Sequence, residues 1–277
     1  MAKSQRSRPI GIFDSGLGGL TVFRAVSRVL PREDIIYFGD TARVPYGIKS
    51  RETIIRFSHE NAALLMSCGV KALVVACNSS SSHALSSLGR DLPVPVLGVI
   101  RPGVRRAVEV SRSGRIGVIA TQATVSSHAY RDAVKRLRPR AKVVEQACPL
   151  FVPLVEEGWF RRDVTRRIAA EYLRGVRRAG IDTLILGCTH YPLLKTVLRQ
   201  VLGQDVVLID SAEAVARDLA ELLEKQDLQR PRARKGRYRF YASDEPRHFQ
   251  QAAKRFLQRD IKVMRRVTDG NNIYSKS

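Results

Sequence analysis

The alternation of short apolar runs with longer amphipathic segments is the feature that most constrains the fold of this chain. Each apolar run has the length and composition typical of a buried strand, and a helical pattern follows most of them. This order indicates an α/β fold with mainly parallel sheets covered by helices. The predicted strands are Ile10–Phe13, Ile35–Phe38, Ala72–Ala76, Val94–Gly98, Ile116–Ala120, Lys142–Gln146, Thr183–Gly187, Val206–Ile209, Arg237–Ala242 and Lys262–Arg266. The predicted helices include Gly19–Leu30, Ser50–Ser67, Ser126–Leu137, Arg161–Ala179 and Ala212–Lys225.

An internal repeat links the two halves of the chain. The segment CGVKALVVACNS (Cys68–Ser79) aligns with AGIDTLILGCTH (Ala179–His190), and RPIGIFDS (Arg8–Ser15) aligns with GRIGVIAT (Gly114–Thr121). Chance similarity between buried strands could explain one such match. Two matches in the same order and at similar offsets favour two related α/β halves.

The length of 277 residues is sufficient for two compact units, each with its own core. The repeat places their boundary near Leu97–Pro102. The segment after Asp210 carries a helix, a short strand and another helix. It could pack back on the first half or form an appendage.

The formal net charge is +22, from 48 Lys and Arg against 26 Asp and Glu. A charge of this size raises the possibility of a nucleic acid or acidic partner. The basic residues are scattered along predicted helices, which favours solvated helix faces over a dedicated nucleic-acid surface. The densest basic run, Arg230–Arg239, adjoins two aromatic residues but matches no nucleic-acid-binding motif. The positive field would also collect small anionic substrates.

The chain has no apolar run near the roughly 18–20 residues that span a bilayer, so no membrane association is expected. Its basic start lacks the apolar stretch of a signal peptide before Asp14, and we expect a cytoplasmic protein. None of the four cysteines belongs to a CxxC motif or to a cluster with zinc-like spacing. In a reducing compartment they should be free thiols, and we expect no metal. The cysteines are Cys68, Cys77, Cys148 and Cys188.

Polar residues follow several predicted strands at the point where each strand ends. In parallel sheets ligands bind at the carboxyl ends of the strands, so these positions are candidates for a site. Each has a structural explanation when taken alone: a cysteine there is often a small buried residue, and Asp or Asn often forms a turn or a helix cap. Their joint placement favours function. The groups are Asp14-Ser15, Asp40-Thr41, Cys77-Asn78-Ser79 and Cys188-Thr189-His190.

Cys77 and Cys188 occupy the same place in the two repeats, so two related halves would present two thiols to one cleft. A disulfide is disfavoured in a reducing compartment, and a nucleophile would use only one thiol. Two-base proton transfer at carbon uses both: one thiolate removes a proton and the opposite thiol delivers one to the other face. The base needs a cationic or hydrogen-bonding neighbour, and His190 lies two residues after Cys188.

Five segments together resemble the glutamate racemase family of the aspartate/glutamate racemase superfamily. They occur in family order and spread over residues 10–210, and their combination is specific although each one alone is weak. The segments are GIFDSGLGGLTV (Gly11–Val22), IIYFGDTARVPYG (Ile35–Gly47), VVACNS (Val74–Ser79), ACPLFVPLVEEG (Ala147–Gly158) and LGCTHYPLL (Leu186–Leu194). The resemblance implies two pseudo-symmetric α/β domains with the active site between them. The first domain would comprise residues 1–97 joined by 211–277, and the second residues 98–210.

The resemblance also implies the chemistry and the residues that perform it. Cys77 would deprotonate D-glutamate and Cys188 would deprotonate L-glutamate, without a cofactor or a metal. The implied assisting residues are Asp14 and His190, with Asp40 and Glu156 as nearby electrostatic groups. The implied substrate-binding residues are Asp14, Ser15, Tyr46, Gly47, Asn78, Ser79, Thr121, Thr124, Thr189 and His190. The product would be D-glutamate for peptidoglycan, and a homodimer is expected.

One residue departs from the family pattern, and rival functions remain open. The family usually has Thr after the Cys-Asn pair, whereas this chain has Ser79, which keeps the hydroxyl and is expected to change affinity at most. Racemisation of aspartate or another amino acid is an alternative. A one-cysteine decarboxylase of related fold would leave the second cysteine unexplained. A basic nucleic-acid-binding protein is the alternative from a different class.

Overall fold

The computed structural model describes residues 5–231 and 234–268. Small parts of three sequence predictions therefore lie outside the described residues. These parts are residues 1–4 of the basic start, 232–233 of the run Arg230–Arg239, and 269–277 of the C-terminal segment assigned to the first domain.

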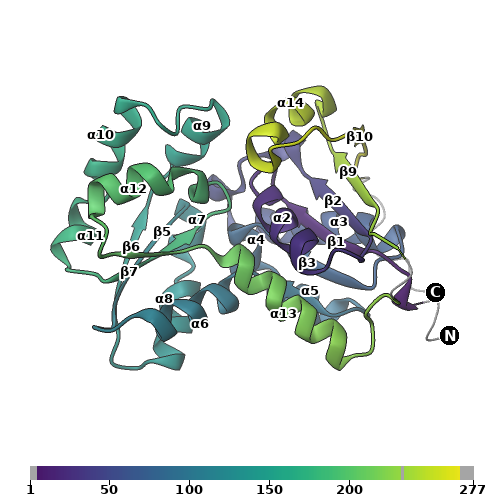
Figure 1. Cartoon of the computed structure of the whole chain (residues 1–277), viewed down its shortest axis with the longest axis horizontal. Helices are drawn as coiled ribbons and strands as arrows, with labels where there is room; N and C mark the ends of the chain where they lie inside the picture. Colours follow the sequence, from purple (N-terminus) through teal and green to yellow (C-terminus); the bar gives the residue numbers. More distant parts are fainter. Residues whose placement is uncertain (1–4, 232–233, 269–277) are drawn as a thin grey trace.

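Two parallel sheets organise the chain (Figure 1). The first sheet has the strand order β10-β9-β2-β1-β3-β4 and the second has the order β6-β5-β7-β8. All neighbouring strands in both sheets run parallel. The predicted α/β fold with mainly parallel sheets is confirmed. The strands are β1 (Ile10–Asp14), β2 (Ile35–Gly39), β3 (Ala72–Val75), β4 (Val96–Gly98), β5 (Arg115–Ala120), β6 (Lys142–Ala147), β7 (Thr183–Gly187), β8 (Val207–Ile209), β9 (Tyr238–Ala242) and β10 (Val263–Arg265).

Helices connect the strands and cover the sheets, as a parallel sheet requires. Strands β1, β2, β3 and β7 are consequently buried along their whole length. The α-helices are α2 (Leu20–Val29), α3 (Arg51–Ser67), α4 (Asn78–His83), α5 (Leu85–Asp91), α6 (Ile100–Val110), α7 (Gln122–Ser126), α8 (Ala129–Leu137), α9 (Phe151–Glu156), α10 (Asp163–Tyr172), α11 (Arg174–Arg178), α12 (Lys195–Leu202), α13 (Ser211–Lys225) and α14 (Pro246–Leu257). Short 3₁₀ turns are η1 (Thr41–Arg43), η2 (Tyr46–Ile48) and η3 (Tyr191–Leu194).

Two helix predictions were wrong in their limits. The helix predicted over 126–137 begins at Ala129, because His128 has a left-handed backbone with φ of 53° that interrupts it. The helix predicted over 161–179 divides into α10 and α11 at Leu173, two residues before Gly175, which has low helix propensity. Within the described residues, no helix has both the length and the apolar content that crossing a bilayer requires.

The internal repeat extends to strand order and register. The order β2-β1-β3-β4 in the first sheet corresponds to β6-β5-β7-β8 in the second. Ile10 pairs with Ala72 between β1 and β3, and Ile116 pairs with Thr183 between β5 and β7. The sequence alignment matches these same residues, Ile10 with Ile116 and Ala72 with Thr183. The two halves are therefore one βα arrangement used twice.

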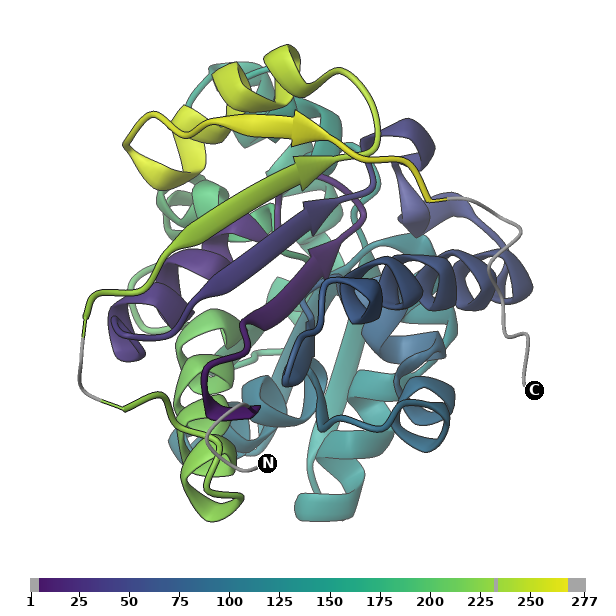
Figure 2. The same cartoon turned by 90° about the vertical axis from the view of Figure 1, so that its right-hand side faces the viewer.

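The C-terminal segment returns to the first sheet. After β8 the chain forms α13, which packs against α2 and α6, and then adds β9 beside β2 and β10 beside β9 (Figure 2). Of the two arrangements that the sequence left open for this segment, packing back on the first half is the one observed. The domain limits 1–97 with 211–277, and 98–210, stay a prediction.

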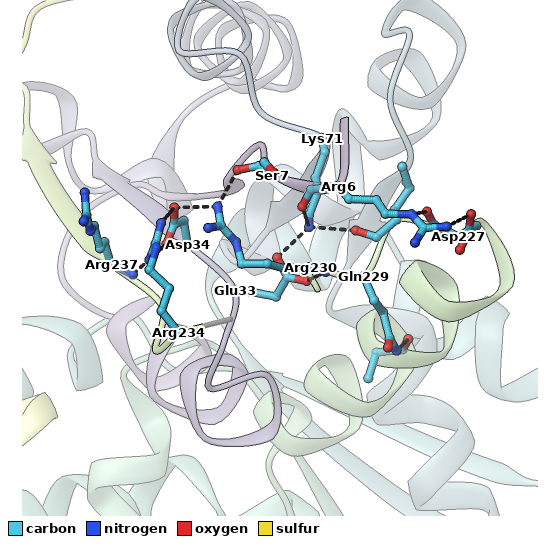
Figure 3. Close-up of polar contacts among 12 residues, drawn as sticks. Arg6, Ser7, Glu33, Asp34, Lys71, Asp227, Gln229, Arg230, Arg234 and Arg237 are labelled. Carbon is cyan, nitrogen blue, oxygen red and sulfur yellow. Dashed lines mark hydrogen bonds and ion pairs between the residues drawn. The ribbon is translucent and has the colours of Figure 1, made fainter. Parts of the chain in front are cut away.

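A charged cluster holds the connection between α13 and β9 in place (Figure 3). It lies at the end of the first sheet opposite to the carboxyl ends of the strands. The Asp34 carboxylate accepts hydrogen bonds from Arg230 at 2.6 Å and from Arg234 at 2.8 Å. Lys71 forms a buried ion pair with Glu33 at 2.5 Å between Nζ and Oε2. Arg230 and Arg234, two arginines of the run Arg230–Arg239, therefore form internal ion pairs.

Candidate active site

The two repeated cysteines lie at equivalent strand ends, as the repeat predicts. Cys77 follows β3 and stands at the N-cap of α4, and Cys188 directly follows β7. Both side chains are buried, with 5 % and 7 % of their surface exposed. All four cysteines of the chain are free. Each half thus places one buried thiol at the carboxyl edge of its sheet.

Cys188 has a cationic neighbour. Its Sγ lies 3.8 Å from Nδ1 of His190, and Nε2 of the same ring lies 2.9 Å from Oε1 of Glu156 at the end of α9. Burial lowers the pKa of His190, but the hydrogen bonds to Cys188 and Glu156 outweigh it and raise the pKa to about 10. The ring is therefore an imidazolium at neutral pH, and it places a positive charge 3.8 Å from the Cys188 sulfur.

Cys77 has a different environment. Its sulfur is hydrogen-bonded to the Ser15 hydroxyl at 3.7 Å. Burial, together with the nearby Asp14 carboxylate, raises the pKa of the Cys77 thiol to about 11, although hydrogen bonds from Ser80 and Ser15 oppose the shift. At neutral pH this thiol holds its proton. The two sulfurs thus have different surroundings, an imidazolium beside Cys188 and a hydroxyl and a carboxylate beside Cys77.

Asp14 connects the two halves of the site. It is fully buried at the end of β1, and its Oδ1 accepts a hydrogen bond from the Thr189 hydroxyl at 3.4 Å. Burial raises the pKa of the Asp14 carboxyl, and the positive charge of His190 opposes this shift. The same carboxylate raises the pKa of the Cys77 thiol. Asp14 therefore interacts with groups around both thiols.

A cluster of three hydroxyls joins α4 to the β5–α7 turn. Ser79 Oγ lies 3.0 Å from Thr121 Oγ1 and 3.3 Å from Thr124 Oγ1, and the two threonine oxygens are 3.1 Å apart. A hydroxyl can donate and accept at once, so this cluster can reorient toward a carboxylate. Gly47 in η2 packs on the cluster, because a β-carbon built there would lie 2.5 Å from Thr121 Cβ.

Asp40 is placed differently from the other candidates. Its carboxylate accepts hydrogen bonds from the Tyr46 hydroxyl, from Arg43 Nε at 2.7 Å and from Ser243 Oγ at 2.9 Å. Asn61 in turn donates to the Tyr46 oxygen at 2.9 Å. Within the described residues Asp40 has no hydrogen bond to either thiol. It holds η2, and with it Tyr46, in position.

Two residues of the site carry no signal in the sequence. The Tyr130 hydroxyl on α8 donates to Asn78 Oδ1 at 2.6 Å, which links the second half to the residue after Cys77. The Phe256 ring on α14 stands edge-on to the His190 ring, with centroids 5.8 Å apart. Both contacts join segments far apart in the chain. Only the docking of the halves, and of the C-terminal segment, could reveal them.

Gly18 brings the two halves into close contact. A β-carbon at Gly18 would lie 2.1 Å from Thr189 Oγ1 and 2.5 Å from His190 Nδ1, which no side chain could tolerate. The turn after β1 therefore lies directly against the segment after Cys188. Within residues 5–231 and 234–268, no group of three or more His, Cys, Asp or Glu side chains is arranged to hold a metal ion.

This fold and geometry define a class: α/β proteins built of two related halves, each of which places one buried thiol at the carboxyl end of a strand. Comparison with known proteins agrees. Residues 10–219 match the Asp/Glu/Hydantoin racemase family. A glutamate racemase of Geobacter metallireducens is 54 % identical over 250 residues, covering 90 % of this chain and 93 % of that protein. The chain belongs to the Asp/Glu/Hydantoin racemase family.

Solved structures of glutamate racemases have the same fold as this chain. A glutamate racemase isoform from Bacillus anthracis superposes with a TM-score of 0.91 at 38 % identity, covering 94 % of this chain and 97 % of that one. The glutamate racemase of Francisella tularensis, solved in complex with D-glutamate, superposes with a TM-score of 0.90 at 38 % identity. That match covers 97 % of this chain and 100 % of the other.

Proposed function

We propose that this protein interconverts L-glutamate and D-glutamate by proton transfer between Cys77 and Cys188. The observation that carries the proposal is the pair of buried thiols at equivalent strand ends, one beside an imidazolium and the other beside a hydroxyl. Similarity to glutamate racemases over nearly the whole chain supports glutamate as the substrate.

In the direction from L-glutamate, the Cys188 thiolate takes the α-proton and its sulfur becomes a thiol. The electron pair of the broken C–H bond stays on the α-carbon, and the Cys77 thiol delivers its proton to the opposite face. Cys77 is then a thiolate, and D-glutamate has formed. The reverse direction exchanges the two roles. His190, held by Glu156, stabilises the thiolate on Cys188, and preorganised donors must stabilise the carbanion-like transition state.

The substrate's charged groups have matching partners at the strand ends. The hydroxyls of Ser79, Thr121 and Thr124 can donate to a carboxylate, and Asp14 can accept from the ammonium group. Further proposed contacts come from Ser15, Tyr46, Gly47, Asn78, Thr189 and His190. Because Ser79 keeps the hydroxyl of the usual threonine, the cluster is complete in this chain.

The decisive test separates the two thiols. Purified protein should remove the circular dichroism of L-glutamate without added cofactor, and Cys77→Ala and Cys188→Ala should each abolish this activity. In D₂O, Cys77→Ala should still exchange the α-hydrogen of L-glutamate, and Cys188→Ala that of D-glutamate, without net racemisation. Near-normal racemisation by either variant would rule out two-base chemistry. If aspartate is racemised faster than glutamate in parallel assays, aspartate and not glutamate is the substrate.

The cellular setting that we propose is the supply of D-glutamate for peptidoglycan in the cytoplasm. Growth of a D-glutamate-requiring bacterial strain should be restored by this protein and not by its Cys77→Ala variant. Failure of the active protein to restore growth would argue against this role.

We also propose a homodimer, in line with the expectation from the family resemblance. Sedimentation equilibrium should give about twice the mass of the 31.0 kDa chain. A single species at the mass of one chain over the concentration range of the assay would contradict it.

A further inference from the structure

A basic surface lies on the second half of the molecule, away from the thiols. A hollow of about 670 Å³ is formed by α10 and α11, and four of the residues that line it are arginines. The lining residues are Arg167, Ala170, Glu171, Arg174, Arg177 and Arg178. The arginines near Asp34 form internal ion pairs, whereas the four arginines of this hollow are exposed to solvent.

The charges in the hollow are only partly neutralised. Arg167 pairs with Asp163 at 2.7 Å, and Arg174 pairs with Glu171. Within the described residues, the side chains of Arg177 and Arg178 form no hydrogen bond or ion pair, and both are exposed. The hollow therefore keeps a net positive charge that is available to a ligand.

The basic surface continues onto the edge of the second sheet. Arg115, the first residue of β5, lies over Gly180: a β-carbon built there would be 3.1 Å from its Nη1. Lys142, the first residue of β6, is the register partner of Arg115. Asp182 lies nearby, and its carboxylate accepts hydrogen bonds from Ser111, Ser113 and Thr183. We define the basic strip as Arg167, Arg174, Arg177, Arg178, Arg115 and Lys142.

We propose that the basic strip binds the phosphate backbone of nucleic acid without sequence preference. Guanidinium groups bind phosphate oxygens in a forked geometry, and a row of cations suits a polyanion. An acidic protein would fit the charge, but protein interfaces usually need a buried apolar or aromatic anchor. The lining of the hollow offers only Ala170 as an apolar side chain. The overall charge of +22 attracts a polyanion to the protein, and the strip would hold it.

The position of the strip makes this binding compatible with catalysis. Arg115 and Lys142 stand at the starts of β5 and β6, whereas the candidate active site lies at the opposite, carboxyl ends of the strands. β5 has six residues, so the two edges are separated by about 17 Å. A nucleic-acid backbone bound at Arg115 and Lys142 would leave the carboxyl ends of the strands, where the thiols lie, uncovered.

The test measures binding of a fluorescein-labelled DNA duplex of about 20 base pairs by fluorescence anisotropy, at several salt concentrations. The double variant Arg177→Gln/Arg178→Gln removes two charges from the strip. The control Arg32→Gln/Arg247→Gln removes two charges from exposed positions on the first half. Net charge changes equally in both, so only the position of the charges differs. Thermal melting of each variant establishes that it is folded.

We expect the strip variant to bind the duplex at least about ten-fold more weakly near 0.1 M salt, and to lower the slope of log K against log salt by about 1.8. The control should change affinity by less than about two-fold. Equal weakening in both variants would show that charge acts diffusely, and would overturn the proposal. Absence of wild-type binding would do the same. Displacement of the duplex by poly-L-glutamate at equal charge concentration would indicate that the strip binds an acidic protein. That result would also overturn the proposal.

Discussion

Replacement of Glu156 by Gln is the most informative change at the candidate site, because it alters one charge and little else. Gln has nearly the same shape as Glu and can still accept a hydrogen bond from His190. The carboxylate, 2.9 Å from Nε2, stabilises the imidazolium form of His190. Its loss disfavours that form, so the pKa of His190 must fall.

The size of the shift follows from the strength of the contact. A hydrogen bond to a charged group contributes about 1.5–3 kcal/mol, and one pKa unit corresponds to about 1.36 kcal/mol. The Glu156 side chain is 30 % exposed, and solvent screening moves the effect toward the lower end. We therefore expect the pKa of His190 to fall by about one unit from its value of about 10.

The assay is the pH profile of kcat/KM for L-glutamate, followed by circular dichroism. In the proposed mechanism the protonated form of His190 stabilises the Cys188 thiolate, so activity should decline as pH rises through the pKa of His190. The pKa of the Cys77 thiol, about 11, is higher, so His190 sets the first part of the decline. The midpoint should move about one unit downward in Glu156→Gln, and should stay in place in Glu157→Gln, its exposed neighbour. An unchanged or higher midpoint, or an equal shift in the control, would refute this account of the ion pair.

Three further changes test other parts of the structure. Tyr130→Phe removes the hydrogen bond between Tyr130 and Asn78 and should weaken D-glutamate binding in calorimetry by about two- to thirteen-fold, a loss of about 0.5–1.5 kcal/mol. Unchanged affinity would exclude a positioning role. Gly18→Ala forces a methyl group against the opposite half and should abolish most activity, whereas Gly89→Ala, which meets no atom within 4 Å, should not; equal activities would contradict the close approach. Lys71→Met removes the cationic partner of the buried Glu33 carboxylate and should lower the free energy of unfolding in urea by about 3–5 kcal/mol. A loss below about 1 kcal/mol would mean that the pair is dispensable.

The strands could be predicted because their signal is local. Apolar runs such as Ala72–Ala76 and Thr183–Gly187 have the period and residue types of buried strands, and they contain all of β3 and all of β7. The candidate site could be predicted from the sequence for a related reason. Parallel strands end at one edge, so the residues after them gather there whatever the details of packing.

Contacts between segments far apart in the chain could not be predicted from the sequence. Tyr130 meets Asn78 only when the two halves dock, and Phe256 reaches His190 only because α14 returns beside the second half. The run Arg230–Arg239 is a second case in which the sequence did not reveal long-range contacts. Its composition indicated a solvated or nucleic-acid-binding surface, yet Arg230 and Arg234 are bound to Asp34. Composition counts charges and does not identify their partners.

The return of the C-terminal segment to the first sheet has a consequence for synthesis on the ribosome. β2 is an edge strand until β9 pairs with it, and β9 begins at Tyr238. The second sheet uses only residues 115–209, so it can close earlier, although it is encoded later than β1–β4. The unpaired edge of β2 is a site for wrong pairing during this interval. The half that emerges first is thus the last to be completed, and a chain that stops before Tyr238 leaves that edge open permanently.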